Sequence, residues 1–122
     1  MSNIGVIGYK NQASKIINIL KKKKFKLYIY IKNKKIFADE KKVTYTTNLE
    51  ILKKNCSIIF IASPSKTHIK YIYYFSKYKK YIFCEKPPFT KLSDYKKLNA
   101  LSSASKNKIY FALSPSLCQQ RG

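Results

Sequence analysis

The chain has 122 residues, enough for one compact domain and too few for a second of ordinary size. Hydrophobic residues make up 45% of it, so a buried core is expected, and no apolar run reaches the roughly 18 residues of a membrane span. The net charge is +21, yet every basic residue except Arg121 is a lysine. Because base readout favours the arginine guanidinium, a nucleic-acid-binding domain is the weaker alternative.

The cysteines and the chain start exclude further classes. Cys56, Cys84 and Cys118 form no Cys-x-x-Cys pair, and His68 is the single histidine. This pattern argues against a disulfide framework and a metal site, so we expect reduced thiols. Residues 1–5 lack the features of a signal peptide, which predicts a cytoplasmic protein with no membrane partner.

Apolar, β-rich runs alternate with polar segments of helical period along the chain. Strands are expected at residues 3–8, 25–31, 43–45, 57–62, 81–84 and 109–112. Helices are expected at residues 13–20, 47–54, 65–78 and 91–105. This alternation with short connections predicts the α/β class: a single Rossmann-like domain over residues 1–112 with a doubly wound parallel sheet.

The expected helices carry specific signals. Thr47 and Glu50 have the spacing of a capping box. The helix over 65–78 presents either Ile69, Ile72 and Phe75 or Tyr73 and Tyr74 to the sheet. The helix over 91–105 has four residues spaced for burial, namely Leu92, Tyr95, Leu98 and Leu101.

The last ten residues differ in composition, because every lysine lies at or before position 108. An irregular tail over residues 113–122 is expected. A truncated or frameshifted end is a second hypothesis for this segment.

A glycine-containing turn follows the first expected strand. A dinucleotide-binding turn has the pattern Gly-x-Gly-x-x-Gly/Ala between strand and helix. Here the six positions are occupied by Gly8, Tyr9, Lys10, Asn11, Gln12 and Ala13. The first and third requirements are met, whereas Lys10 stands in place of the second glycine and would hinder or neutralise a pyrophosphate. An ordinary strand-to-helix turn is an equal alternative.

The end of the second expected strand bears on the choice of cofactor. NAD-binding domains usually have an acidic residue there for the ribose diol. This chain has Lys32, Lys34 and Lys35 instead, which suits the 2′-phosphate of NADP. We therefore favour NADP over NAD, with solvated surface lysines as the alternative interpretation.

Two polar clusters follow the fourth and fifth expected strands. The first contains Ala62, Ser63, Pro64 and His68, and the second contains Glu85, Lys86 and Pro87. In a doubly wound sheet both lie at the carboxyl edge, where a nicotinamide would sit. A lysine there can polarise or protonate a substrate oxygen.

The segments IGVIG at 4–8, IFIASPSKTH at 59–68 and YIFCEKP at 81–87 resemble the N-terminal domain of the Gfo/Idh/MocA (glucose–fructose oxidoreductase/inositol dehydrogenase) family. The resemblance covers about residues 3–112. It implies NAD(P)-linked oxidation or reduction of a sugar, cyclitol or nucleotide-sugar hydroxyl. It also implies a catalytic Lys86 near the nicotinamide, a Glu85 that places the nicotinamide ribose, and a loop at 62–64 that lines the cofactor. His68 would lie near the dinucleotide or have a structural role.

Two departures from that family qualify the prediction. Lys10 replaces the second glycine, and the large substrate domain that follows in the family is missing. We therefore expect a dinucleotide-binding domain that is inactive alone and is completed by a separately encoded substrate domain or by homo-oligomerisation. A non-catalytic, cofactor-sensing NAD(P)-binding module is the second hypothesis.

Overall fold

The computed structural model describes residues 3–8, 11–23, 25–32, 42–85 and 91–112. The strands are β1 (Asn3–Ile7), β2 (Lys26–Tyr30), β3 (Val43–Thr46), β4 (Ile58–Ile61), β5 (Tyr81–Glu85) and β6 (Ile109–Ala112). The helices are α1 (Asn11–Lys21), α2 (Leu49–Asn55), the 3₁₀ turn η2 (Ser65–Thr67), α3 (His68–Ser76), α4 (Leu92–Asn99) and α5 (Ser103–Lys106). The six expected strands are confirmed, each within two residues of the predicted bounds.

The six strands form one parallel sheet in the order β3-β2-β1-β4-β5-β6. The chain therefore builds the sheet outward from β1 in one direction and then returns to build it in the other. The predicted doubly wound, Rossmann-like architecture is confirmed. Its topological switch point lies between β1 and β4, where ligands bind in sheets of this kind.

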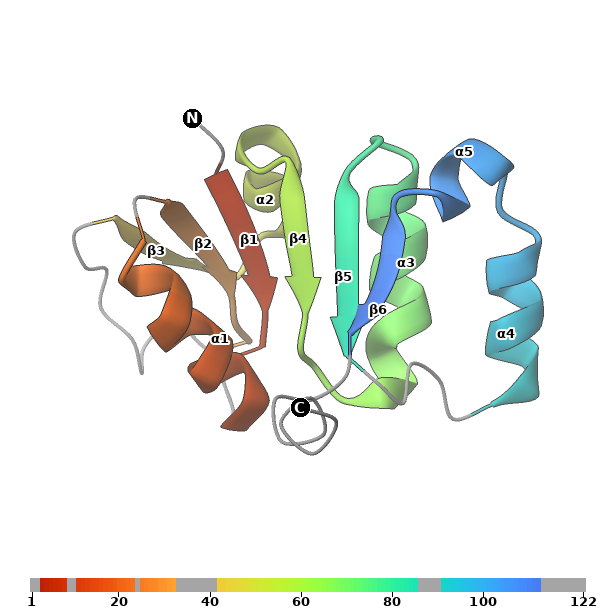
Figure 1. Ribbon diagram of the computed structural model, residues 1–122, viewed down its shortest axis with the longest axis horizontal. Helices are drawn as coiled ribbons and strands as arrows, with labels where there is room; N and C mark the ends of the chain where they lie inside the picture. Colours follow the sequence, from red (N-terminus) through yellow and green to blue (C-terminus); the bar gives the residue numbers. More distant parts are fainter. Residues whose placement is uncertain (1–2, 9–10, 24, 33–41, 86–90, 113–122) are drawn as a thin grey trace, which may run out of the picture.

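Helices cover both faces of the sheet, but unequally. Figure 1 shows α1 in front of the half that contains β1 and β2, α2 and α3 behind the sheet, and α4 beyond the β6 edge, where it packs on α3. Alternate residues of β2 feed the two cores: Leu27 and Ile29 pack on the α1 side, and Tyr28 packs on the other. The behind-sheet core includes Ile72 and Phe75 of α3, both fully buried.

The close packing of α2 against β1 depends on Gly5. A methyl group at this position would lie 2.9 Å from side-chain carbons of both Leu52 and Ile59. The glycine thus lets the helix approach the central strand, and it buries Leu52 completely.

The start of α2 differs from the expected capping box. Asn48, not Thr47, is the N-cap, and its side-chain oxygen accepts a hydrogen bond of 3.0 Å from the backbone N–H of Glu50. The hydroxyl oxygen of Thr46, two residues before Asn48, accepts a hydrogen bond from the Asn48 N–H. Asn48 caps the helix in place of Thr47 because its side chain reaches the N–H of Glu50, the second residue of α2.

The third expected helix begins later and in two stages. A 3₁₀ turn over Ser65–Thr67 leads into α3, which ends at Ser76 and not at residue 78. The stripe of Ile69, Ile72 and Phe75 is buried, so the first of the two predicted faces is confirmed.

The predicted single helix over 91–105 is wrong. It is divided into α4 and α5, because the Ser102 hydroxyl accepts a hydrogen bond from the Ser105 N–H and caps a new helix. Leu92 is 72% exposed and Tyr95 is 41% exposed, contrary to expectation. Leu98 and Leu101 do pack against the core.

Within the described ranges, no helix has both the length and the apolar character needed to cross a membrane.

Burial controls the chemistry of Cys56, which is 2% exposed at the end of α2. Burial raises the pKa of its thiol to about 12, against a smaller lowering by nearby Lys80. The thiolate is the reactive form, so it is scarce at pH 8. In a Cys118→Ser variant, we expect Cys56 to resist Ellman's reagent until urea unfolds the protein. Rapid labelling of Cys56 in the folded state, mapped by mass spectrometry, would contradict this.

Candidate nucleotide-binding site

Three strand ends converge at the switch point. Gly8 follows β1, Lys32 follows β2, and the loop over residues 62–64 follows β4. Backbone hydrogen bonds hold them together: the Gly8 N–H donates to Tyr30 O at 3.2 Å, and the Ala62 N–H donates to Ile7 O at 3.0 Å. These residues, far apart in sequence, therefore share one edge of the sheet.

Gly8 is required by this geometry. Its φ of +111° lies in the region that favours glycine, and a Cβ there would lie 2.9 Å from the backbone oxygen of Ala62. Because the obstacle is backbone, a side chain at Gly8 would have to displace the β4 loop. The first position of the predicted turn thus has the residue that its role demands.

The third position also fits. Ala13, in the first turn of α1, is fully buried and packs in the core between α1 and the sheet. Asn11 and Gln12 form the helix start, at the same edge as Gly8. The N-terminus of an α-helix offers backbone N–H groups and a positive dipole end to an anion. Tyr9 and Lys10 lie outside the described residues, so the approach of a pyrophosphate at Lys10 stays a prediction.

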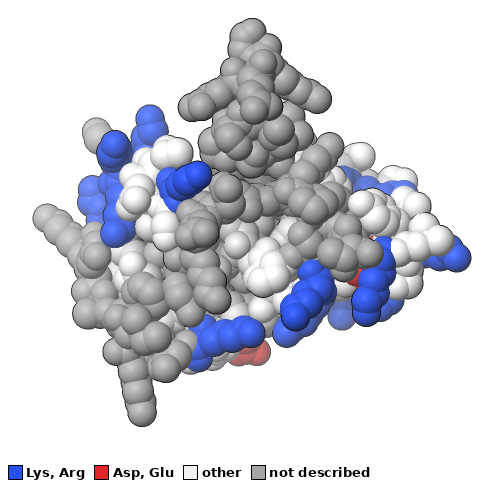
Figure 2. Space-filling view, turned by 90° about the horizontal axis from the view of Figure 1, so that it is seen from below, with Lys and Arg blue, Asp and Glu red and all other residues white. Residues whose placement is uncertain are grey.

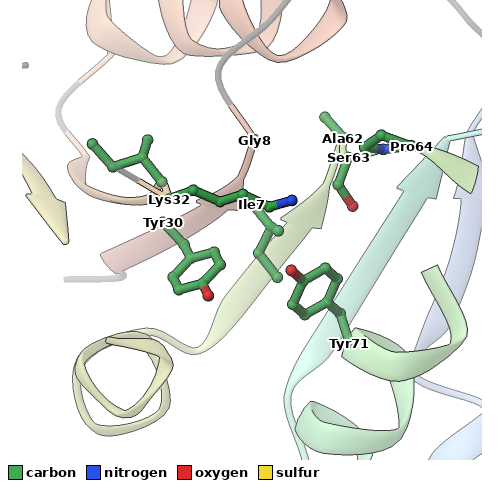
Figure 3. A pocket seen from close by; sticks show the side chains of 9 residues that line it. Ile7, Gly8, Tyr30, Lys32, Ala62, Ser63, Pro64 and Tyr71 are labelled. Carbon is green, nitrogen blue, oxygen red and sulfur yellow. The ribbon is translucent and has the colours of Figure 1, made fainter. Parts of the chain in front are cut away.

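A pocket of about 160 Å³ opens among these strand ends. Its nine lining residues are Ile7, Gly8, Tyr30, Ile31, Lys32, Ala62, Ser63, Pro64 and Tyr71, and Figure 3 shows how they surround it. This volume is below the roughly 300 Å³ of a site that encloses a drug-sized ligand, so it suits one part of a dinucleotide. Five residues predicted from sequence line it, namely Gly8, Lys32, Ala62, Ser63 and Pro64.

Two tyrosines of the pocket were missed by sequence reasoning. Tyr30 of β2 and Tyr71 of α3 meet edge to face, with ring centroids 6.1 Å apart. Burial, and secondarily Tyr30, raises the pKa of the Tyr71 hydroxyl, which therefore stays a neutral donor at physiological pH. The period-2 pattern of β2 could have placed Tyr30 here, but nothing local marks Tyr71.

The loop after β4 is held by its own hydroxyl groups. Thr67 Oγ1 donates to Pro64 O at 2.7 Å and lies 2.7 Å from Ser63 Oγ. Since the threonine proton is already used, Ser63 is the donor in the second bond. The Ser63 oxygen therefore keeps lone pairs that can accept a hydrogen bond at the pocket wall.

His68 links the loop over residues 62–64 to β5. It is 1% exposed, with Nε2 2.7 Å from Ser63 O and Nδ1 3.1 Å from Cys84 Sγ. A carbonyl only accepts, so Nε2 donates to Ser63 O, and Nδ1 makes the second contact, with the Cys84 thiol. His68 does not line the pocket; it supports Ser63, which does.

The second polar cluster is described in part. Glu85 is the last residue of β5, whose Cys84 pairs with Ile61 of β4. Its backbone thus ends at the edge that carries Ser63, as predicted. Lys86 and Pro87 lie outside the described residues, and their roles stay predictions.

Figure 2 looks onto this edge, and among the described residues it shows lysine side chains at several places around the periphery, with little acidic surface. A field of this sign favours phosphate-bearing ligands.

The chain matches a family model described as "Oxidoreductase family, NAD-binding Rossmann fold" (GFO_IDH_MocA) over residues 2–113. It belongs to the Gfo/Idh/MocA family. The resemblance inferred from the three motifs is therefore confirmed, and the domain is of the NAD-binding Rossmann type. No curated protein sequence matches the chain.

Solved structures share the fold. An oxidoreductase from Bacillus cereus superposes with a TM-score of 0.70 at 22% identity, over 93% of this Gfo/Idh/MocA chain and 34% of the other. A probable dehydrogenase from Thermotoga maritima gives 0.70 at 20%, over 90% and 35%. Biliverdin reductase from Synechocystis, in complex with biliverdin and NADP⁺, gives 0.70 at 17%, over 92% and 37%. The chain thus spans about a third of these proteins.

Proposed function

We propose that this Gfo/Idh/MocA chain is the dinucleotide-binding domain of an NAD(P)-linked oxidoreductase acting on a sugar, cyclitol or nucleotide-sugar hydroxyl. The observation that carries the proposal is the convergence of Gly8, Lys32 and Ser63 around one pocket at the switch point. The substrate class comes from the resemblance of the Glu85-Lys86-Pro87 element and the β4 loop to the family.

In this proposal, different residues contact different parts of the cofactor. The N–H groups at the start of α1 face the pyrophosphate, Gly8 gives it room, and Lys32 meets the adenosine ribose. Ser63 accepts a hydrogen bond from the nicotinamide half, and Glu85 places the nicotinamide ribose. NADP is favoured over NAD because a cation, and no carboxylate, follows β2.

The proposed chemistry centres on Lys86, directly after β5. When bound, a nicotinamide supplies or accepts a hydride. The Lys86 ammonium donates a proton to the substrate oxygen during reduction, and the amine takes it back during oxidation.

We further propose that a substrate domain on another polypeptide, or an oligomer, completes the active site. The chain covers 34% to 37% of the three solved proteins above, so most of each lies outside the shared domain. A non-catalytic cofactor-binding module is the second candidate, because the pocket is built from this domain's own residues. Sugar turnover on adding a downstream-encoded polypeptide would support the first, and its absence despite tight NADPH binding the second.

Lys32→Glu tests the cofactor assignment. By calorimetric titration, we expect wild-type protein to bind NADPH more tightly than NADH. The variant should bind NADPH about tenfold more weakly, because a carboxylate repels the 2′-phosphate, and should bind NADH at least as well. Lys106→Glu, an equal charge change on α5 far from the pocket, is the control. If both variants weakened NADPH binding equally, Lys32 would act only through the overall positive charge and not through contact with the 2′-phosphate. If the wild-type protein bound neither cofactor, the proposed function would be overturned.

A further inference from the structure

A second pocket lies at the opposite edge of the sheet, where the amino ends of β5 and β6 meet the carboxyl end of α3. Figure 1 shows this corner at the top of the view, between α5 and the link from α3 to β5. The volume of the pocket is about 420 Å³, and it shares no residue with the pocket at the switch point. We call it the lysine pocket; it is lined by Ser76, Lys77, Lys79, Lys80, Ser102, Ala104, Ser105 and Lys108.

Cationic side chains dominate the lysine pocket. Half of its lining residues are lysines, against about one residue in five of the whole chain, so the surplus exceeds the general composition. None of the three described carboxylates, Glu50, Glu85 and Asp94, lines the pocket. The carboxyl end of α3 contributes about half a negative charge, which offsets only a small part of four ammonium groups. The described surroundings therefore leave most of this charge uncompensated.

Two of the lysines occupy partly enclosed positions. Lys80 and Lys108 directly precede β5 and β6, and both are half-buried. The Lys108 Nζ donates a hydrogen bond to Lys79 O at 3.3 Å and lies 5.0 Å from the centre of the Tyr81 ring. These two contacts order the Lys108 ammonium group before any ligand binds, which lowers the entropic cost of using it in a site.

The serine side of the pocket is already hydrogen-bonded. Ser102 Oγ donates to Ser105 Oγ at 3.1 Å, and Ser105 Oγ donates to Ser76 O at 3.4 Å, which links α5 to the end of α3. Because these hydroxyl protons are in use, an anion in the pocket would be recognised by the lysines. Lysine ammonium groups act as point charges, so they select for the number of charges on a ligand more than for its geometry.

We propose that the lysine pocket binds a chain of two or three linked phosphate groups, either free or at the end of a nucleotide. A single phosphate group carries about 1.5 to 2 negative charges and would leave about half of the ammonium charge unmatched, whereas linked phosphates balance it. The pocket volume lies within the roughly 300–1,000 Å³ of small-molecule sites. The inference uses no residue of the proposed nucleotide site and does not depend on cofactor binding.

Amide chemical shifts of the ¹⁵N-labelled full chain provide the test, with inorganic triphosphate as the probe at physiological salt. We expect saturable shifts at residues 76–80 and 102–108, and binding of inorganic phosphate at least about tenfold weaker than that of triphosphate. ATP distinguishes the two sources of the ligand. Tighter binding than triphosphate, with further shifts beside the pocket, would indicate a nucleotide, and equal binding at the same residues would indicate a free phosphate chain.

A double variant tests the lysines themselves. Lys79→Asn/Lys80→Gln removes two charges and leaves Lys108 in place, and asparagine tolerates the φ of +57° at position 79. We expect this variant to bind triphosphate about tenfold more weakly. Lys15→Gln/Lys96→Gln, which removes two exposed lysines of α1 and α4 outside the pocket, is the matched control and should stay within about twofold of wild type. Thermal unfolding checks that both variants are folded.

Several outcomes would overturn the proposal. Equal weakening by the two double variants would mean that triphosphate is attracted only by the overall positive charge. Shifts confined to residues 8, 11–13 and 62–64 would assign triphosphate to the pocket at the switch point. Absence of saturable binding, or equal affinity for phosphate and triphosphate, would also contradict a site for linked phosphates. The shifts of the wild-type chain decide these last outcomes even if a variant fails to fold.

Discussion

A Gly8→Ala substitution should lower the free energy of unfolding by about 2 kcal/mol and weaken NADPH binding more than tenfold. The positive φ is costly for any side chain, by roughly 1–3 kcal/mol. The added methyl group would also lie 2.9 Å from the Ala62 backbone oxygen. Relief of that contact must move the β4 loop, which is a wall of the pocket. Urea unfolding and calorimetric titration measure the two effects.

Gly5→Ala separates the loss of stability from the loss of binding. Its methyl group would meet the side chains of Leu52 and Ile59 at 2.9 Å, away from the pocket. Overpacking of this kind typically costs about 1–3 kcal/mol. We therefore expect Gly5→Ala to destabilise the fold and leave the NADPH affinity of the folded protein unchanged. If Gly8→Ala bound NADPH as wild type does, the pocket at the switch point would not be the nucleotide site.

The sheet could be predicted because its signals are local. Runs such as 57–62 are apolar and β-branched, and turn residues bound them, so their existence follows from the chain itself. Their parallel order follows from general rules of connection. The glycine turn and the β4 loop were placed at one edge by the same reasoning, and the structure brings Gly8 and Ser63 together there.

The predictions that failed concern burial, helix caps and pocket lining, which tertiary contacts determine. Helical period identifies a stripe but not what faces it. In the described chain α4 packs chiefly on α3 near the edge of the sheet, so Leu92 stays exposed although its spacing is correct. Competing caps were equally ambiguous, because Thr47 and Asn48 are both good N-cap residues. Tyr71 enters the pocket only because α3 packs behind β4 and β5, which no local pattern reports.

His68→Ala should lower the free energy of unfolding by about 3 kcal/mol and also weaken NADPH binding. The substitution leaves a cavity where an imidazole is 1% exposed, and it removes the partner of Ser63 O and Cys84 Sγ. The β4 loop then loses its tie to β5, so Ser63 is no longer fixed at the pocket wall. Thermal unfolding and titration at a temperature where the variant is folded would measure both.

Two further variants decide whether His68 positions the loop or only fills space. Ile72→Ala, in the same helix and fully buried, should cost comparable stability without changing NADPH affinity. His68→Gln keeps an N–H that can reach Ser63 O and should recover much of the affinity, although it packs less well. If all three variants bound NADPH equally, His68 would be a core residue with no influence on the site. If His68→Ala and His68→Gln lost affinity alike while Ile72→Ala did not, the imidazole link to Cys84, and hence the end of β5, would be the part that matters.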